Sequence, residues 1–182
     1  MTGDNFSPEF EIPESKLDEA ACCVGDAVHN LRAALDLLAC EAVERSGQSP
    51  KDVHFPFAQT ASELTSPGGG MIQRKKFNRA RSDAQTLLLA LEPHGEPHGN
   101  ALLWALHRLD LTDKHRDLLA VAAPLAKPGA YIGGAHFKPN DYESPKLVLT
   151  GDILPGKEVL TVLDGLAGEV ERTIEAFRNL GW

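Results

Sequence analysis

Residues 15–47, SKLDEAACCVGDAVHNLRAALDLLACEAVERSG, contain the longest helical pattern in the chain. Their apolar side chains recur mostly at steps of three and four residues, which is the period of an amphipathic helix, and Gly47 is a typical helix stop. We therefore predict a helix of roughly 30 residues, with Gly25 as the place for a bend or break. The apolar positions are Leu17, Val24, Val28, Leu31, Leu35 and Leu38.

The helical pattern continues in two later stretches of the chain. We predict helices over residues 71–91 and 101–121, the second with Asn100 as its N-cap. The segment HFPF separates the first long helix from these two, and its Pro56 argues against a regular element. We expect its aromatic residues, Phe55 and Phe57, to fill one side of the core.

The pattern changes after Pro128, where apolar residues recur with a period of two. AYIGGAHF, KLVLTGDI and KEVLTVL are typical of short strands separated by turns, and GEVERTIEAFRNL is typical of a last amphipathic helix. The predicted fold is mainly α with a small antiparallel β-sheet before the C-terminal helix (α+β). We predict one domain over residues 1–182, divided into a helical bundle at 14–128, the sheet at 129–163 and the helix at 164–182.

The composition is that of an ordinary globular protein with an acidic balance. The 182 residues carry a formal net charge of −8, which excludes a global positive field for coating nucleic acid or anionic lipid. No apolar run approaches the ~20 residues of a membrane span, and the N-terminal MTGDNFSPEFEIPE lacks the features of a signal peptide. The cysteines (Cys22, Cys23 and Cys40) lack disulfide or zinc spacing, so we expect buried thiols. These features predict a cytoplasmic protein that does not associate with membranes.

The most informative stretch for chemistry is LLWALHRLDLTDKHRDLL, residues 102–119. Arg108 and His115 are seven positions apart, so on a helix they face the same way to within about 20°. Trp104 and Leu111 share their stripe, and an apolar stripe normally packs on a neighbouring helix. We therefore expect Arg108 and His115 to project into a seam or cleft between helices. There, arginine can bind an anion and histidine can move a proton near neutral pH, which suits phosphate chemistry.

A second polar cluster lies in GDAVHNLRAALD, residues 25–36. Asp26, His29 and Asn30 share one face of the predicted helix and Asp36 extends it, while Arg32 and Asp36 can form an i,i+4 pair. We expect this stripe to meet that of the helix at 101–121. Asp26 or Asp36 would then hold Arg108, and Asn30 would orient a phosphate or His115. Asp113, together with Asp26, His29 and Asp36, completes the predicted supporting network.

The same residues allow two other interpretations. They can form an internal polar network that only fixes the register of the helices, with Arg108 paired to a carboxylate. They can also ligate a metal through His29, His107 and His115 with Asp26 or Asp110. His107 and His115 point about 80° apart on a helix, which is poor for sharing one ion, so no metal site and no cofactor are predicted. Motifs typical of P-loop, Rossmann and α/β-hydrolase proteins do not occur in the sequence.

The segment MIQRKKFNRAR, residues 71–81, is a local basic run in an acidic chain. A run of this kind is either a solvated helix face or a contact surface for RNA or phosphate, with Phe77 available for stacking. The predicted nucleic-acid-binding residues are Arg74, Lys75, Lys76, Arg79 and Arg81, together with Lys114 and Arg116 from the second motif.

At GDAVHNLRAALD, HFPF and LLWALHRLDLTDKHRDLL, the sequence resembles a group of bacterial proteins with the motifs GDxxHNLRxALD, FP and LDxxDKHR. The resemblance covers residues 20–120 and brings no established activity. More distantly, the chain is similar to the HEPN superfamily (higher eukaryotes and prokaryotes nucleotide-binding), whose all-helical domains are often dimeric. Many of them are metal-independent ribonucleases in defence and toxin–antitoxin systems, with an Arg and a His separated by four to six residues. Arg108 and His115 fit that motif, although the predicted sheet is not part of a minimal HEPN domain.

The resemblance implies a HEPN-like domain that binds or cleaves RNA. His115 would act as general base and acid, Arg108 would stabilise the charge on the phosphorane, and Asn30 would position the phosphate. One chain supplies one such pair, so a two-fold homodimer is the expected way to obtain both an acid and a base. The alternative is a non-catalytic helical bundle with a structural polar network, which binds a protein or a small ligand.

Overall fold

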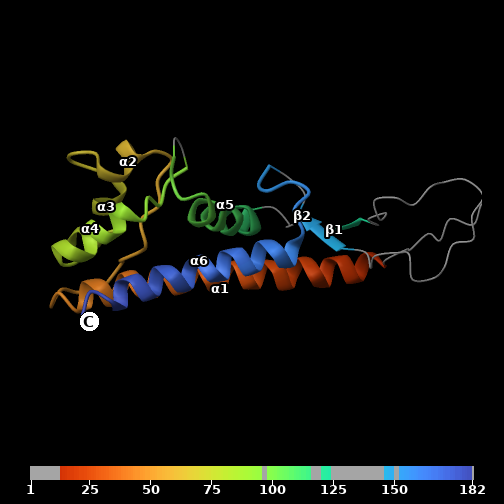
Figure 1. Ribbon diagram of the computed structural model, residues 1–182, viewed down its shortest axis with the longest axis horizontal. Coiled ribbons are helices and arrows are strands. Elements are labelled where there is room, and N and C mark those ends of the chain that lie inside the picture. Colours follow the sequence, from red (N-terminus) through yellow and green to blue (C-terminus); the bar gives the residue numbers. More distant parts are fainter. Residues whose placement is uncertain (1–12, 96–97, 116–119, 124–145, 150–151, 182) are drawn as a thin grey trace, which may run out of the picture.

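A long helix, α1 (Glu14–Glu44), runs along most of the molecule and carries the core (Figure 1). The computed structural model describes residues 13–95, 98–115, 120–123, 146–149 and 152–181. Two helices pack on α1: α5 (Ala101–His115) and α6 (Val159–Arg178). α6 lies alongside α1 and runs in the same direction (Figure 1). α5 runs the opposite way, since His29 of α1 meets Asp110 while Gly25 meets Asp113.

The apolar stripes of these helices explain why they pack together. The buried residues of α6 recur at three- and four-residue steps and the fully buried residues of α5 do the same, so each helix turns one face toward α1. The stripes consist of Val159, Val162, Leu166, Val170 and Phe177 on α6, and Leu103, Leu106 and Leu109 on α5.

Short helices at the end of α1 form a compact arm around the second half of that helix. They are α2 (Ala61–Thr65), α3 (Met71–Arg74), the 3₁₀ turn η1 (Phe77–Arg79) and α4 (Ser82–Ala90). Phe77 joins the arm to α6 through an edge-on contact with Phe177, with ring centroids 6.3 Å apart. The prediction that Phe55 and Phe57 fill the core is confirmed, because both rings are almost completely buried.

Two short strands pair antiparallel near the start of α6. Strand β1 (Ala120–Ala123) pairs with β2 (Lys146–Leu149), with Ala120 opposite Leu149 and Ala123 opposite Lys146. This pairing differs from the predicted three-stranded sheet at 129–163. One of its strands lies before residue 129, and the predicted strand at 157–163 is wrong, because α6 already begins at Val159. The segment AYIGGAHF lies outside the described residues.

The prediction of a mainly helical fold is confirmed, with corrections at individual boundaries. α1 has the predicted length but continues through Gly25, which is buried against the Asp113 carboxylate of α5 and serves a close approach rather than a break. The predicted helix at 71–91 is interrupted at Lys76, which has a left-handed φ of 58°. The helix predicted to reach Val121 is described as far as His115, and β1 begins at Ala120.

Two further expectations concern side chains. Asn100 caps α5 as predicted, since its Oδ1 accepts a hydrogen bond from the Leu103 backbone N–H. The expectation of buried thiols is wrong for Cys22 and Cys23, which are exposed, because the buried face of α1 begins only at Val24. Cys40 is half-buried, with Sγ 3.5 Å from the Val53 carbonyl oxygen.

Within the described ranges, none of the helices is both long and apolar enough to cross a bilayer.

The adjacent glycines Gly69 and Gly70 provide a test of the packing of the arm. A Cβ at Gly70 would lie 2.7 Å from Ser66 N and 2.8 Å from Leu64 O, and these backbone atoms cannot rotate away. A Cβ at Gly69 would meet no described atom within 4 Å. Gly70→Ala should therefore lower the free energy of unfolding by about 1–3 kcal/mol, and Gly69→Ala should change it by less than about 0.5 kcal/mol. Chemical denaturation measures both, and equal stability of the two variants would contradict the described packing.

Candidate functional site

A buried arginine, Arg32, connects α1 to the segment that contains Phe55 and Phe57. Its Nη1 donates to Asp36 Oδ1 at 2.6 Å, and its Nη2 donates to the Phe55 carbonyl oxygen at 3.4 Å. The guanidinium carbon lies 4.6 Å from the centroid of the Phe57 ring, which is a cation–π contact. Arg32 is therefore compensated by a charge, a carbonyl and an aromatic face, as a buried guanidinium requires.

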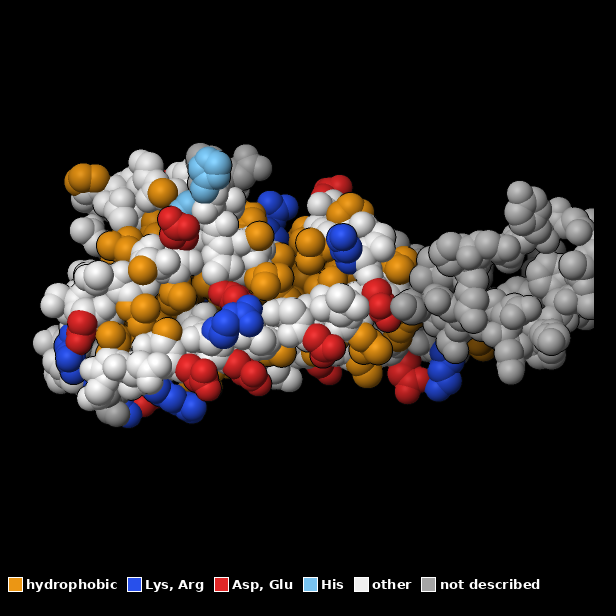
Figure 2. Space-filling model, in the orientation of Figure 1, with side chains coloured by type: hydrophobic (Ala, Val, Ile, Leu, Met, Phe, Trp, Pro, Cys, Tyr) orange, Lys and Arg blue, Asp and Glu red, His pale blue; other side chains and the backbone are white. Residues whose placement is uncertain are grey.

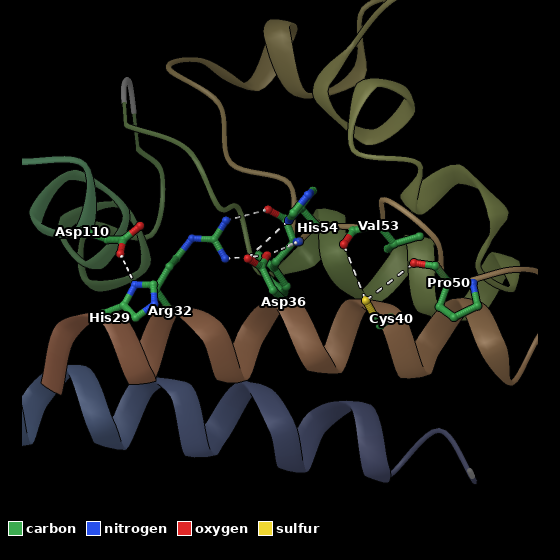
Figure 3. Close-up of polar contacts among 9 residues, drawn as sticks. His29, Arg32, Asp36, Cys40, Pro50, Val53, His54 and Asp110 are labelled. Atoms are coloured by element: carbon green, nitrogen blue, oxygen red, sulfur yellow. Dashed lines mark hydrogen bonds and ion pairs between the residues drawn. The ribbon is translucent and has the colours of Figure 1, made fainter. Parts of the chain in front are cut away.

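Asp36 completes this connection from the same helix. Its Oδ1 also accepts the backbone N–H of Phe55 at 2.8 Å, and its Oδ2 lies 3.5 Å from Nδ1 of His54 (Figure 3). The predicted i,i+4 pair of Arg32 and Asp36 thus exists. It binds both the backbone N–H and the backbone C=O of Phe55 in the HFPF segment. The Arg32–Asp36 pair is a structural clamp between α1 and this segment.

A second pair joins α1 to α5 one turn further toward the N-terminus. His29 Nδ1 lies 3.0 Å from Asp110 Oδ1, with the carboxylate 5% exposed and the imidazole 54% exposed (Figure 3). When Asp110 is ionised it can only accept a hydrogen bond, and His29 Nδ1 is then the donor. The pair orients an accessible imidazole by means of a buried carboxylate.

His107 of α5 lies against the clamp. Its ring stacks on Phe57 at 4.7 Å with an interplanar angle of 3°, and its Nδ1 is buried without a hydrogen-bond partner among the described residues. Burial, reinforced by the charge of Arg32, lowers the pKa of the His107 imidazole to about 4. His107 is therefore a neutral, packed side chain near physiological pH.

The two faces of α5 carry different charges. Asp110 pairs with His29, and the Asp113 carboxylate lies against Gly25, so both acidic residues face α1. Arg108 is exposed and lies about 160° around the helix from Asp110, which turns it away from α1. Its guanidinium lies 6.0 Å from the centroid of the Trp104 ring. We call the side of α5 that carries Trp104, Arg108, Leu111 and helix position 115 the outer stripe of α5.

The structure separates residues that the sequence grouped together. Arg108 does not project into a seam between helices, which corrects that expectation, and Asp36 holds Arg32 rather than Arg108. Asp26 and Asn30 are exposed on α1, so they do not meet the outer stripe of α5 in one chain. His115 ends α5 on the same side as Arg108, but its side chain, like that of Lys114, and all of Arg116 lie outside the described residues.

The basic segment at 71–81 is largely engaged within the fold. Lys76 Nζ lies 2.7 Å from Asp52 Oδ2 and lowers the pKa of that carboxyl group, and Arg79 donates to the Ser49 carbonyl oxygen at 3.3 Å. Arg81 pairs with Asp83. Arg74 is exposed and Lys75 half-buried. The segment is therefore not one continuous basic helix face.

Sequence reasoning missed the buried role of Arg32 and the pairing of His29 with Asp110. The spacing of Arg32 and Asp36 was a local signal, but Asp110 lies 81 residues from His29 and nothing local connects them. In the part of the chain that the structure describes, no group of three or more His, Cys, Asp or Glu residues is placed to hold a metal ion.

No protein-family model matches the chain, and no match was found among the curated proteins or the solved structures with which it was compared.

The two arginines of this region should differ in their effect on stability. Arg32→Ala removes the guanidinium from a partly buried ion pair and from Phe57, and should lower the free energy of unfolding by about 2–3 kcal/mol. Arg108→Ala removes an exposed side chain and should cost less than about 0.5 kcal/mol. Urea denaturation of both variants tests this contrast. A larger loss for Arg108→Ala would place the structural arginine on α5 instead of α1.

His107 should make the protein less stable in acid. Its pKa is about 4 in the folded chain and near 6.5 in the unfolded one, so between these values only the unfolded chain gains the proton. Stability should therefore fall as the pH is lowered from 6.5 to 4, by at most about 3 kcal/mol from this group. His107→Phe should show a weaker decline in unfolding free energy over that range. Identical pH profiles for the two proteins would contradict a neutral, buried His107.

Proposed function

We propose that the chain is a HEPN-like, RNA-directed domain that acts as a metal-independent endoribonuclease. The observation that carries the proposal is the outer stripe of α5, where Arg108 is exposed and lies two turns before position 115 on the same side of the helix. Arg108 has no carboxylate partner in the described part of the chain, so its charge is available to a phosphate. Arg32 and Asp36, not Arg108, form the partly buried ion pair of the polar network inside the fold.

The proposed roles follow from the chemistry of these side chains. His115 would take the proton of a ribose 2′-hydroxyl as general base and return one to the leaving oxygen as general acid. Arg108 would stabilise the negative charge that develops on the phosphorane. Asn30 lies on α1, away from the outer stripe, so its proposed role of positioning the phosphate fits a two-fold homodimer in which it comes from the second chain.

The distribution of surface charge favours contact with RNA at α5 over contact with RNA across the whole surface. Acidic side chains gather along the lower edge of the face in Figure 2, where α1 and α6 lie, and the whole chain carries −8. Both acidic residues of α5 face α1, which keeps negative charge away from Arg108. A strand of RNA would therefore approach along α5, and Arg74 and Lys75 are the basic residues of the arm best able to extend that path.

A second candidate is a non-catalytic bundle that binds a protein or small ligand. The Arg32–Asp36 clamp favours it, because part of the predicted polar network is structural. The two candidates differ in what they require of Arg108. An Arg108 that belonged to the structural network would be buried and paired, whereas RNA chemistry needs it accessible, and it is exposed.

Cleavage of a labelled RNA tests the proposal. His115→Ala and Arg108→Ala should each lower the rate by about 10²–10⁴-fold, and the double variant should fall well short of additivity, because the two groups act as a unit. Arg178→Ala, which removes an exposed arginine at the end of α6, is the charge-matched control and should leave the rate unchanged. EDTA should have no effect.

The same samples test the homodimer. Light scattering should give about twice the 19.7 kDa of one chain, as a two-fold assembly requires. Wild-type protein that cleaves no RNA would contradict the ribonuclease. Cleavage that survives both substitutions would contradict the assigned residues, and cleavage by a stable monomer would contradict the dimer.

A further inference from the structure

Trp104 is the aromatic residue of the outer stripe, and neighbouring residues pack against its indole. It is half-buried, and the backbone of Gly95 packs so closely against it that a Cβ at position 95 would lie 2.7 Å from Trp104 Cε2. The ring of His107 lies 5.4 Å away at an interplanar angle of 47°. The indole is thus packed on one side while part of it stays accessible, so its orientation is fixed before any ligand arrives.

Arg108 lies one turn further along the same stripe. Its guanidinium lies over the indole, 6.0 Å from the ring centroid and at the outer limit of a cation–π contact, so it does not cover the ring tightly. Leu111, 40% exposed, continues the stripe by another turn. The stripe therefore offers a partly exposed indole in a fixed orientation with a loosely placed cation over it, and its described residues include no acid.

We infer that Trp104 and Arg108 bind single-stranded RNA, with an unpaired base stacked on the indole and the adjoining phosphate on the guanidinium. The inference deepens the proposed function and rests on it for the nature of the ligand. A π-face stacks on any base that is free of its neighbours, and bases in a duplex are already stacked on one another. A base that stacks on the ring takes the place of the guanidinium, which then pairs with the backbone phosphate of the same nucleotide.

An apolar peptide is a poorer occupant of this stripe. Covering Trp104 and Leu111 with apolar side chains would also desolvate Arg108, which has no acidic residue on the described stripe to compensate its charge. A polyanion supplies that compensation itself. The charges therefore favour RNA over a hydrophobic partner.

Tryptophan fluorescence gives a direct test that does not depend on cleavage. The chain contains two tryptophans, so Trp182→Phe in the full-length protein leaves Trp104 as the sole reporter. The probe is a short single-stranded RNA with 2′-O-methyl groups, which blocks the nucleophile, and the comparison is the same sequence as a duplex. The single strand should quench Trp104 in a saturable way, and the duplex should require a much higher concentration.

Substitutions at position 104 separate stacking from apolar contact. Trp104→Leu should weaken binding of the single strand by about 5- to 150-fold, the range expected for losing one stacked base, whereas Trp104→Phe should retain most of the affinity. Leu160→Ala, which removes an exposed apolar side chain from α6, should leave it unchanged. Thermal denaturation of each variant identifies any that fails to fold, and the fluorescence titration keeps the native Trp104 in any case.

The outcomes distinguish this inference from the ribonuclease. Quenching by the single strand without any cleavage of ordinary RNA would uphold the stacking site and overturn the proposed activity. Cleavage with unchanged Trp104 fluorescence, or with equal affinity in Trp104→Leu and Trp104→Phe, would overturn the stacking site and leave the activity standing. Equal quenching by duplex, or quenching that accompanies only self-association in light scattering, would overturn it as well.

Discussion

The burial of one guanidinium constrains the centre of this molecule. A guanidinium stays charged in a protein, so the burial of Arg32 depends on compensation by Asp36, the Phe55 carbonyl and the Phe57 ring. Asp36 lies on the same helix, whereas Phe55 lies 23 residues further along the chain. The contacts of Arg32 with Phe55 and Phe57 therefore hold the HFPF segment on α1. That segment in turn presents Phe57 to His107, so the spacing of α1 and α5 follows from the same interaction. An ion pair of this kind is better evidence of a specified arrangement than of stability, because desolvation offsets much of its attraction.

α5 combines a structural and an accessible side on one short helix. Its carboxylates, Asp110 and Asp113, are used in the contact with α1, where His29 and the bare backbone of Gly25 receive them. This arrangement removes the negative charge from the side that carries Arg108. The accessible side is thus more basic than the helix as a whole, and it holds the groups on which the proposed RNA chemistry depends.

The basic segment illustrates how a fold can neutralise charges that look available in the sequence. Three of its cations find oxygen partners nearby: Lys76 on Asp52, Arg79 on the Ser49 carbonyl and Arg81 on Asp83. Exposed pairs of this type contribute little to stability, since solvent screens them and ordering the side chains costs entropy. Their main effect is to reduce the positive potential of the arm.

The sequence by itself determined the elements whose information is local. The three- and four-residue apolar period predicted α1 and α5, the Asn100 side chain predicted the start of α5, and the aromatic residues of HFPF predicted their own burial.

The tertiary structure alone decided which side of α5 faces α1. The apolar stripe of Trp104 and Leu111 suggested one side, whereas Leu103, Leu106 and Leu109 formed the buried one, because a helix that is apolar on more than one side does not show which side has a partner. The same holds for the candidate site: the period placed Arg108 and position 115 on one side, but only packing made Arg108 accessible and gave the buried position to Arg32. Contacts between residues far apart in the chain, such as His29 with Asp110, have no local signal, since their free energy arises only when the helices meet.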